Sequence, residues 1–241
     1  MFSFINSFIS KFKSLLSSPD NPNHSYSNSY TKEKGRKKAK FLMDKGEYLE
    51  RSIFDIVDKI IGYGPKKILV DLDIKKVNTG SNQIDLVVLH KTGIYVIEAK
   101  NLSGYIFGDN DHLNWIQKLG KNNTYKFYNP IKQNTSHINQ VKRVLEIQNT
   151  DTIVSLIVFG NRCTVNYRGD LDSLNFTTSI ITLDKLKRCI KGHFSSRESI
   201  FSENEIFDMY DKLSTYARSD SSVKSEHIEY VKKMQKRIKT K

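Results

Sequence analysis

The feature that most constrains the fold is a pair of strongly β-forming runs between residues 84 and 101, which read IDLVVLHKTGIYVIEAKN. The runs flank Lys91, Thr92 and Gly93, and a short glycine-containing turn between two such runs is typical of a β-hairpin. We therefore expect two adjacent antiparallel strands here, with the rest of the chain arranged around them.

Three ionisable groups lie in these otherwise apolar strands. Asp85 is in the first strand, and Glu98 and Lys100 stand two apart in the second, so the latter two project from the same face. Burying such groups alone is costly, so they either pair in a salt bridge or line a cleft that holds a cation. Two converging carboxylates are hard oxygen ligands for Mg²⁺, and a nearby ammonium can orient a water or stabilise charge on a phosphate. The set suits phosphodiester hydrolysis.

The order Asp85, then Glu98-Ala99-Lys100, resembles the D…ExK core of the PD-(D/E)xK nuclease superfamily. The flanking sequence resembles, more narrowly, the nuclease-related (NERD) domain over residues 40–150. The resemblance implies an α/β fold of the restriction-endonuclease kind, with a mixed sheet and helices on both faces, and metal-dependent cleavage of nucleic acid. The matching segments, in chain order, are Gly46-Glu47, Gln83-Ile84-Asp85, Gly93, Ile97-Glu98-Ala99-Lys100-Asn101, Gly104, Trp115 and Asn129-Pro130-Ile131-Lys132-Gln133.

The resemblance also implies a metal site. Asp85 and Glu98 would bind Mg²⁺ or Mn²⁺, and the backbone carbonyl of Ala99 would add a ligand. Glu47 would supply a third acid from a preceding helix. On a helical wheel Glu50 lies closer to the apolar face than Glu47 does, so Glu50 is the alternative.

Two further residues receive catalytic roles from the resemblance. Lys100 would orient the attacking water and stabilise the pentavalent phosphorus, and Gln133 would assist by holding a water or a phosphate oxygen. His137 follows Gln133 by four residues, which places it on the same helical face. It could act likewise or be an ordinary helix histidine.

The length of the hairpin turn decides whether these groups meet. A three-residue turn over residues 91–93 would pair Asp85 with Ala99 and put it on the opposite face from Glu98 and Lys100. A two-residue turn, a four-residue turn or a bulge would bring Asp85 beside Lys100 and Val87 beside Glu98. We predict one of these three.

The formal net charge of +13 favours a polyanionic partner, which is either nucleic acid or an anionic membrane surface. Two basic segments near the chain ends are candidate nucleic-acid contacts, through Lys34, Arg36, Lys37, Lys38, Lys232, Lys233, Lys236 and Arg237. The two cysteines, Cys163 and Cys189, lack zinc-site spacing, which predicts buried free thiols in a reducing compartment and no structural zinc.

The chain divides into four parts. Residues 1–16 carry their apolar side chains on one arc of a helical wheel, which predicts an amphipathic helix that lies on a membrane, pairs with a partner helix or packs on its own domain. Residues 17–40 read as a flexible basic linker, 41–218 as the nuclease domain and 219–241 as a basic C-terminal helix. No run is apolar and long enough to cross a bilayer. We expect a cytoplasmic protein, with a peripheral membrane location as the alternative; the oligomeric state stays open.

The spacing of apolar residues and the positions of turn-forming and capping residues predict the remaining elements. Strands are expected at residues 67–74, 105–107, 113–117, 152–159 and 178–182, the fourth being a nearly continuous apolar run of a central strand. Helices are expected at residues 46–61 and 184–191. Two more are expected from their start signals: one begins at Asn129 as cap with Pro130, and the other at the capping box from Ser202 to Glu205. Trp115 is assigned to core packing rather than to stacking on a base.

These patterns together predict a Mg²⁺-dependent endonuclease that hydrolyses phosphodiester bonds of DNA. Two alternatives stay open. One is a catalytically silent module that binds nucleic acid or associates with a membrane, and the other is a ribonuclease that uses the same site.

Overall fold

The computed structural model describes residues 45–61, 67–75 and 81–217. Residues 45–217 form one compact unit. The expected N-terminal helix at 1–16, the linker at 17–40, the C-terminal helix at 219–241 and both basic segments lie outside the described residues. Helix α3 (Lys45–Ile61) includes Glu47, but the side chain of Glu47 also lies outside the described part.

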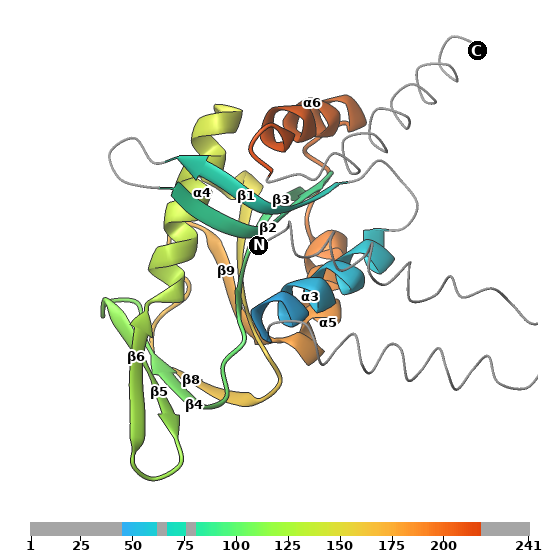
Figure 1. The fold of residues 1–241 in the computed structure, drawn as a ribbon. Coiled ribbons are helices and arrows are strands. Elements are labelled where there is room, and N and C mark those ends of the chain that lie inside the picture. The colour runs from blue at the N-terminus through green and yellow to red at the C-terminus, as the bar shows by residue number, and fades with distance from the viewer. Residues whose placement is uncertain (1–44, 62–66, 76–80, 218–241) are drawn as a thin grey trace, which may run out of the picture. The chain divides into compact units, whose positions relative to one another are not determined.

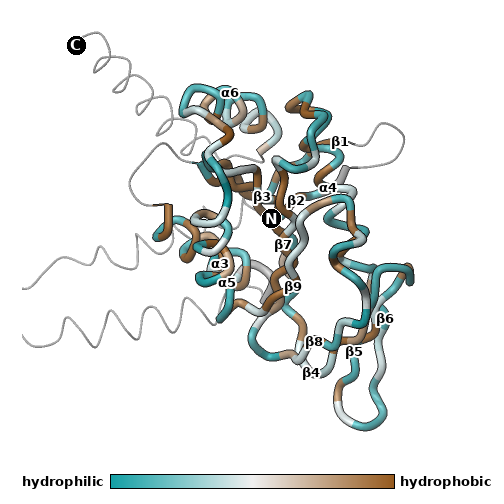
Figure 2. The backbone as a smooth tube through the Cα atoms, turned by 180° about the vertical axis from the view of Figure 1, so that it is seen from behind, coloured by the Kyte–Doolittle hydropathy of each residue, from teal (hydrophilic) through white to brown (hydrophobic). Residues whose placement is uncertain are grey.

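A five-stranded mixed sheet forms the centre of the unit, in the order β1-β2-β3-β7-β9 (Figure 1). Strands β1 (Ile68–Lys75), β2 (Ser81–His90) and β3 (Gly93–Lys100) are antiparallel neighbours. Strands β7 (Ile153–Phe159) and β9 (Thr177–Thr182) then continue the sheet in parallel with β3. Every residue of β7 is buried, as expected for a central strand covered on both faces. Figure 2 colours the backbone by hydropathy, and hydrophobic stretches lie in the strands of the central sheet.

Helices cover both faces of this sheet, which confirms the expected fold class. Helices α4 (Pro130–Leu145) and α6 (Glu203–Ser214) pack on one face, where Ile138 and Leu213 join a core with Val87 and Val96. Helix α3 and helix α5 (Leu183–Ser196) pack on the other face, where Ile53 joins Leu86 and Ile97.

A second, four-stranded mixed sheet has the order β6-β5-β4-β8. It contains β4 (Gly104–Gly108), β5 (Asn114–Leu119), β6 (Asn123–Tyr128) and β8 (Cys163–Tyr167), the last parallel to β4. Trp115 is fully buried and stacks on Phe159 of β7, with 6.2 Å between ring centroids. The assignment of Trp115 to core packing is therefore confirmed, and this residue joins the two sheets.

Most elements expected from the sequence are present. The side chain of Asn129 accepts from the N–H of Ile131 and Pro130 opens α4, while Ser202 and Glu205 form a complete capping box for α6. Strands β6 and β8 were missed, and α5 runs past the expected end at Lys191 to Ser196. Cys163 and Cys189 are free thiols as expected, but both are partly rather than fully buried.

The hairpin has a two-residue turn, Lys91-Thr92, which confirms one of the predicted options. His90 pairs with Gly93 and Leu86 with Ile97, so the next position places Asp85 opposite Glu98. The expected pairing of Asp85 with Lys100 and of Val87 with Glu98 is wrong, because the turn begins one residue earlier than that pairing requires. Gly93 allows this turn, since its φ of 148° favours glycine.

Strand β2 departs from regular alternation at Asp85. Ile84 packs in the same core cluster as Val87, although strict alternation would place these two residues on opposite faces. On the neighbouring strand β1, Asp71 lies between the paired positions Val70 and Leu72 and has a φ of 53°. The two sheet strands are therefore irregular together at the position where Asp85 meets β3.

Candidate functional site

The candidate site lies where β2 and β3 meet helix α4. Glu98 and Lys100 are the first and third of the last three residues of β3. Gln133 and His137 lie about one turn apart on α4. Helix α4 is held at its start by Asn129, whose side chain also donates to the carbonyls of Asp109 and His112. The local sequence signals of a strand end and a capped helix thus bring the site residues together.

Lys100 is the central group of the site. Its Nζ is 2.6 Å from Oε1 of Glu98 and donates to Oε1 of Gln133 at 3.0 Å. The Lys100 side chain is 22% exposed, so the ammonium remains accessible while it contacts both partners. The structure therefore brings together three residues that the sequence separates by up to 35 positions, from Glu98 to Gln133.

Glu98 is nearly inaccessible, with 1% of the residue exposed. Its Oε2 lies 3.2 Å from Nδ1 of His137, a contact that does not have hydrogen-bond geometry. His137 is itself buried, and it contacts Oε2 of the carboxylate whereas Lys100 contacts Oε1. The Glu98 carboxylate is thus held between an ammonium and an imidazole.

Asp85 lies against the end of the same strand. Its Oδ2 accepts a hydrogen bond from the backbone N–H of Ala99 at 2.7 Å. Burial raises the pKa of Asp85 well above its usual value, and the negative charge of Glu98 raises it further, against the lowering effects of the Ala99 bond and of Lys100. Two carboxyl groups that repel each other in a buried place are a common feature of functional sites.

Helix α3 contributes Glu50 to the electrostatics of this place. The charge of Glu50 also raises the pKa of Asp85, so this carboxylate lies near enough to act on the site. The comparison with Glu47 stays open, because the Glu47 side chain lies outside the described residues.

Asn134 is a supporting residue that the sequence reading missed. It is fully buried, and its Nδ2 donates to the carbonyl of Val96 at 3.0 Å and to Oγ of Ser155 at 2.8 Å. These bonds fix α4 on β3 and β7 one residue after Gln133. The signal was Ser155, a single polar residue in the apolar run of β7.

The donor set fits a divalent cation at the level of chemistry. Asp85 and Glu98 offer carboxylate oxygens, and the buried Oε2 of Glu98 has no hydrogen bond within the described part of the chain. A cation there would relieve the repulsion between the two acids. Among the described side chains, which include Glu50, no three His, Cys, Asp or Glu residues are grouped to hold a metal ion. A third ligand would therefore come from Ala99's carbonyl, from Glu47, or from Glu50 after a rearrangement of its side chain.

Comparisons with known proteins place part of this chain in a family. Residues 45–160 match the nuclease-related domain (NERD) family. These residues form a nuclease-related domain. An uncharacterized protein of Bacillus anthracis is 24% identical over 151 residues, which cover 63% of this chain and 67% of that protein. No solved structure matches the chain.

The nuclease-related domain contains every described site residue named above, from Glu50 to Ser155. Strand β9 and helices α5 and α6 follow it and complete the two helical layers. None of the helices in the described ranges is both long and apolar enough to span a bilayer.

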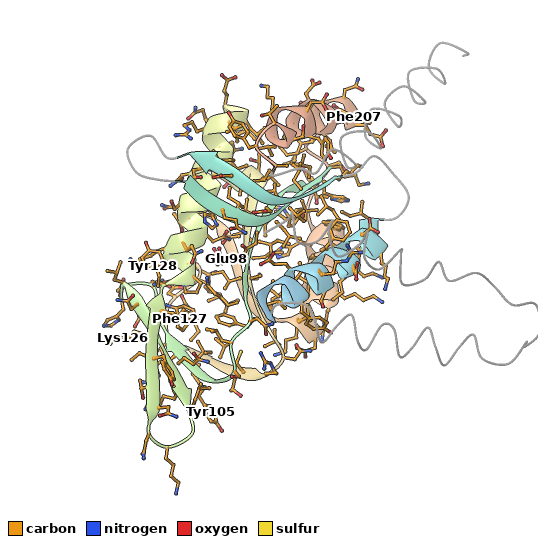
Figure 3. All side chains as sticks on the ribbon, viewed as in Figure 1. Glu98, Tyr105, Lys126, Phe127, Tyr128 and Phe207 are labelled. Carbon is orange, nitrogen blue, oxygen red and sulfur yellow. The ribbon has the colours of Figure 1, made fainter. Side chains whose placement is uncertain are left out.

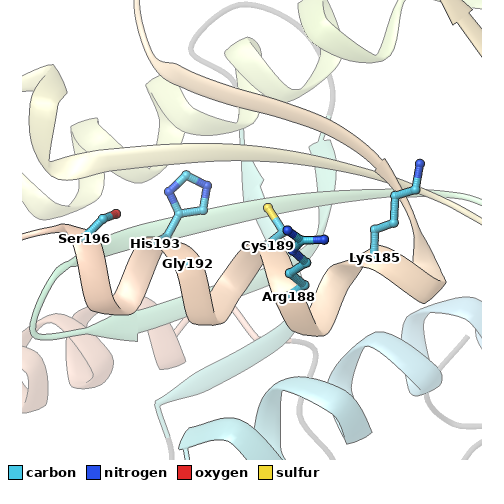
Figure 4. Close-up of a pocket in the computed structure, with 6 residues that line it drawn as sticks. All are labelled: Lys185, Arg188, Cys189, Gly192, His193 and Ser196. Carbon is cyan, nitrogen blue, oxygen red and sulfur yellow. The ribbon is translucent and has the colours of Figure 1, made fainter.

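A surface hollow along α5 lies apart from this site, on the face of the central sheet opposite to α4 (Figure 4). It is lined by Lys185, Arg188, Cys189, Gly192, His193 and Ser196. Burial raises the pKa of the Cys189 thiol, which disfavours the reactive thiolate. The hollow therefore lacks an activated nucleophile.

Proposed function

We propose that the nuclease-related domain is a metal-dependent endonuclease that hydrolyses phosphodiester bonds of DNA at the site formed by Asp85, Glu98, Lys100 and Gln133. The observation that carries the proposal is the position of Lys100, whose ammonium contacts the Glu98 carboxylate and the Gln133 amide beside the Asp85 carboxyl. Two acids that can hold a metal ion, with an ammonium and an amide that can contact a phosphate, suit phosphodiester hydrolysis.

Asp85 and Glu98 would hold Mg²⁺ or Mn²⁺, together with the Ala99 carbonyl and either Glu47 or Glu50. When bound, such an ion polarises a phosphate oxygen and lowers the pKa of a coordinated water. Two neighbouring carboxyl groups would favour a cation over an anion, because the charge of Glu98 already opposes ionisation of Asp85 and a cation would offset that repulsion.

The chain's own residues would divide the remaining tasks. Lys100 would orient the water that attacks phosphorus and stabilise the negative charge that develops on the phosphoryl oxygens. In the reaction one P–O bond to the water oxygen forms and one P–O bond to a sugar oxygen breaks. Gln133 accepts from Lys100 through Oε1, which leaves its Nε2 group as a donor to a phosphate oxygen. Glu98, fixed between Lys100 and His137, would keep the ammonium in place.

Cleavage of plasmid DNA, linear DNA and RNA by the purified full-length protein tests the proposal, each with Mg²⁺, with Mn²⁺ or with EDTA. We expect metal-dependent loss of DNA that EDTA abolishes. Asp85→Asn should reduce the rate more strongly than the roughly 10- to 100-fold typical for loss of a supporting residue, and Gln133→Ala should fall in that range. The control is Asp172→Asn, which removes an exposed carboxylate outside the site. Equal cleavage by wild type and Asp85→Asn would overturn the site assignment.

One observation favours a catalytically silent module as the second candidate. Lys100 already neutralises Glu98 at 2.6 Å, as it would in a plain structural ion pair. Such a module would bind DNA or RNA without cutting it under every metal condition. Cleavage of RNA but not of DNA would instead assign the same site to a ribonuclease.

A further inference from the structure

We propose that the outer face of the second sheet binds single-stranded nucleic acid by stacking bases on exposed aromatic side chains. This outer face consists of the residues that alternate away from the buried Trp115: Tyr105, Phe107, Asn114, Ile116, Lys118, Thr124, Lys126, Tyr128, Thr164 and Asn166. The inference concerns binding alone and does not depend on cleavage at the site of Asp85 and Glu98.

The register of the strands defines this face. Tyr105 pairs with Lys118 and Phe107 with Ile116, while Ile116 in turn pairs with Lys126. Directly paired residues share a face of the sheet, and residues two apart along a strand do so too. Trp115 and Ile106 have the other parity and are fully buried, which fixes the opposite face as the inner one.

Aromatic side chains on the outer face are unusually exposed for their size. Tyr105 is 57% exposed and Tyr128 46%, and both are labelled on this sheet in Figure 3. Tyr105 and Tyr128 lie two strands apart and are offset by four residues along β5, because Tyr105 pairs with Lys118 and Tyr128 pairs with Asn114. An unpaired strand could therefore cross from one ring to the other by spanning roughly 16 Å diagonally over the sheet. Such rings present the flat surfaces on which unpaired bases stack.

Lysines stand among these rings. Nζ of Lys118 lies over the ring of Phe107, 5.4 Å from its centroid, and Lys126 is exposed beside the same row. Within the described strands, the outer face carries no aspartate or glutamate. Positive charge between aromatic platforms matches a phosphate backbone with bases beside it, and a duplex would keep its base faces hidden in its own stack.

The second sheet is also joined directly to the candidate site. Strand β4 begins four residues after Lys100, and β6 ends at Tyr128, one residue before the Asn129 cap of the helix that carries Gln133. Trp115 anchors the sheet to β7 through Phe159. A nucleic-acid strand bound on the outer face therefore lies on a sheet that is connected directly to β3 and to α4, the two elements that carry Lys100 and Gln133.

The test is the fluorescence anisotropy of labelled oligothymidylate and oligouridylate of roughly twelve nucleotides with full-length protein in EDTA, so that cleavage does not contribute. We expect wild-type protein to bind both single strands more tightly than a duplex of equal length. Tyr105→Ala and Tyr128→Ala should each weaken binding by about 5- to 100-fold. Lys118→Gln and Lys126→Gln should each reduce the slope of log affinity against log salt by about 0.7.

Tyr125→Ala is the matched control, because Tyr125 lies on the same strand as Tyr128 and is 53% exposed but has the parity of the inner face. It should bind as wild type does. The proposal is overturned if wild type binds no single strand, if it prefers the duplex, or if Tyr105→Ala and Tyr128→Ala bind as tightly as Tyr125→Ala. Binding to anionic vesicles without binding to oligonucleotides would also overturn it, and would assign the face to a membrane. Failure of the cleavage assay has no bearing on any of these results.

Discussion

The carboxylate of Asp85 accepts a hydrogen bond from the backbone N–H of Ala99, immediately beyond the last paired residues of β2 and β3. A side chain thus satisfies a strand N–H at the point where the ladder between the two strands ends. The bond fixes Asp85 beside Glu98 even though burial and the charge of Glu98 oppose ionisation of Asp85. An ionised Asp85 is therefore unfavourable in the metal-free protein.

Asp85→Asn should stabilise the metal-free protein at neutral pH. Asparagine keeps an oxygen for the Ala99 N–H and removes the charge. Because the folded-state pKa of Asp85 is raised, wild-type protein has this stability below the unfolded pKa and loses it as pH rises through the folded pKa. The difference in melting temperature between variant and wild type should grow from about pH 4 to about pH 8 in EDTA. A difference that does not change with pH would contradict this, and Asp172→Asn is the control.

Lys100 and Glu98 should be energetically coupled. Lys100→Met leaves a carboxylate that is 1% exposed without its ammonium, so it should cost about 3 kcal/mol of unfolding free energy. In Glu98→Gln the same lysine change should cost much less, which gives a coupling energy of about 1–3 kcal/mol. Urea unfolding of the two single variants and the double variant measures this. Additive effects would mean that the ion pair contributes nothing to stability.

Gly93→Ala should destabilise the protein, whereas Gly192→Ala should not. Gly93 has a φ of 148°, and an added Cβ would lie 2.9 Å from the carbonyl oxygen of Thr152, so the cost should be about 1–3 kcal/mol. Gly192 lies within α5 with nothing within 4 Å of an added Cβ, and alanine there should stabilise by about 0.5–1 kcal/mol. Chemical denaturation measures the unfolding free energy of both variants. Equal effects of the two substitutions would contradict the assigned turn.

His90 should make the protein less stable in mild acid. Burial and the charges of Lys67 and Lys91 lower the pKa of His90 from 6.5 to about 4. The stability that depends on neutral His90 is present above the unfolded pKa and is lost as pH falls toward the folded pKa. His90→Phe keeps a ring for stacking on Phe194 and should flatten the loss of stability between about pH 6.5 and about pH 4. A pH profile equal to that of the wild type would refute this role.

The sequence predicted elements whose signals are local. The apolar run of β7, the Asn129-Pro130 start of α4 and the capping box of α6 were all visible without a structure, because each depends on a few neighbouring residues. Strands β6 and β8 were missed, because β6 has exposed aromatic residues on both faces and β8 is only five residues long. Their strand character depends on pairing with β5 and β4 rather than on a hydrophobic pattern.

The site was foreseen as a set of residues but not as a geometry. The pairing position of Asp85 depended on where a two-residue turn begins, and a shift of one residue in that position changes every partner. The contacts of His137 with Glu98 and of Asn134 with Ser155 join residues 39 and 21 positions apart, so they follow from the packing of α4 on the sheet. The roles of Glu47 and Glu50 stay predictions.

The second sheet is connected to the rest of the unit by four chain segments: β3 to β4, β6 to α4, β7 to β8, and β8 to β9. A lid that opens and closes moves about a hinge of a few residues. Four connecting segments, together with the buried Trp115, resist such a movement of the second sheet. A ligand should thus meet a second sheet that is already in its binding position. Its association rate should rise in proportion to protein concentration without reaching the plateau that a slow opening step would impose.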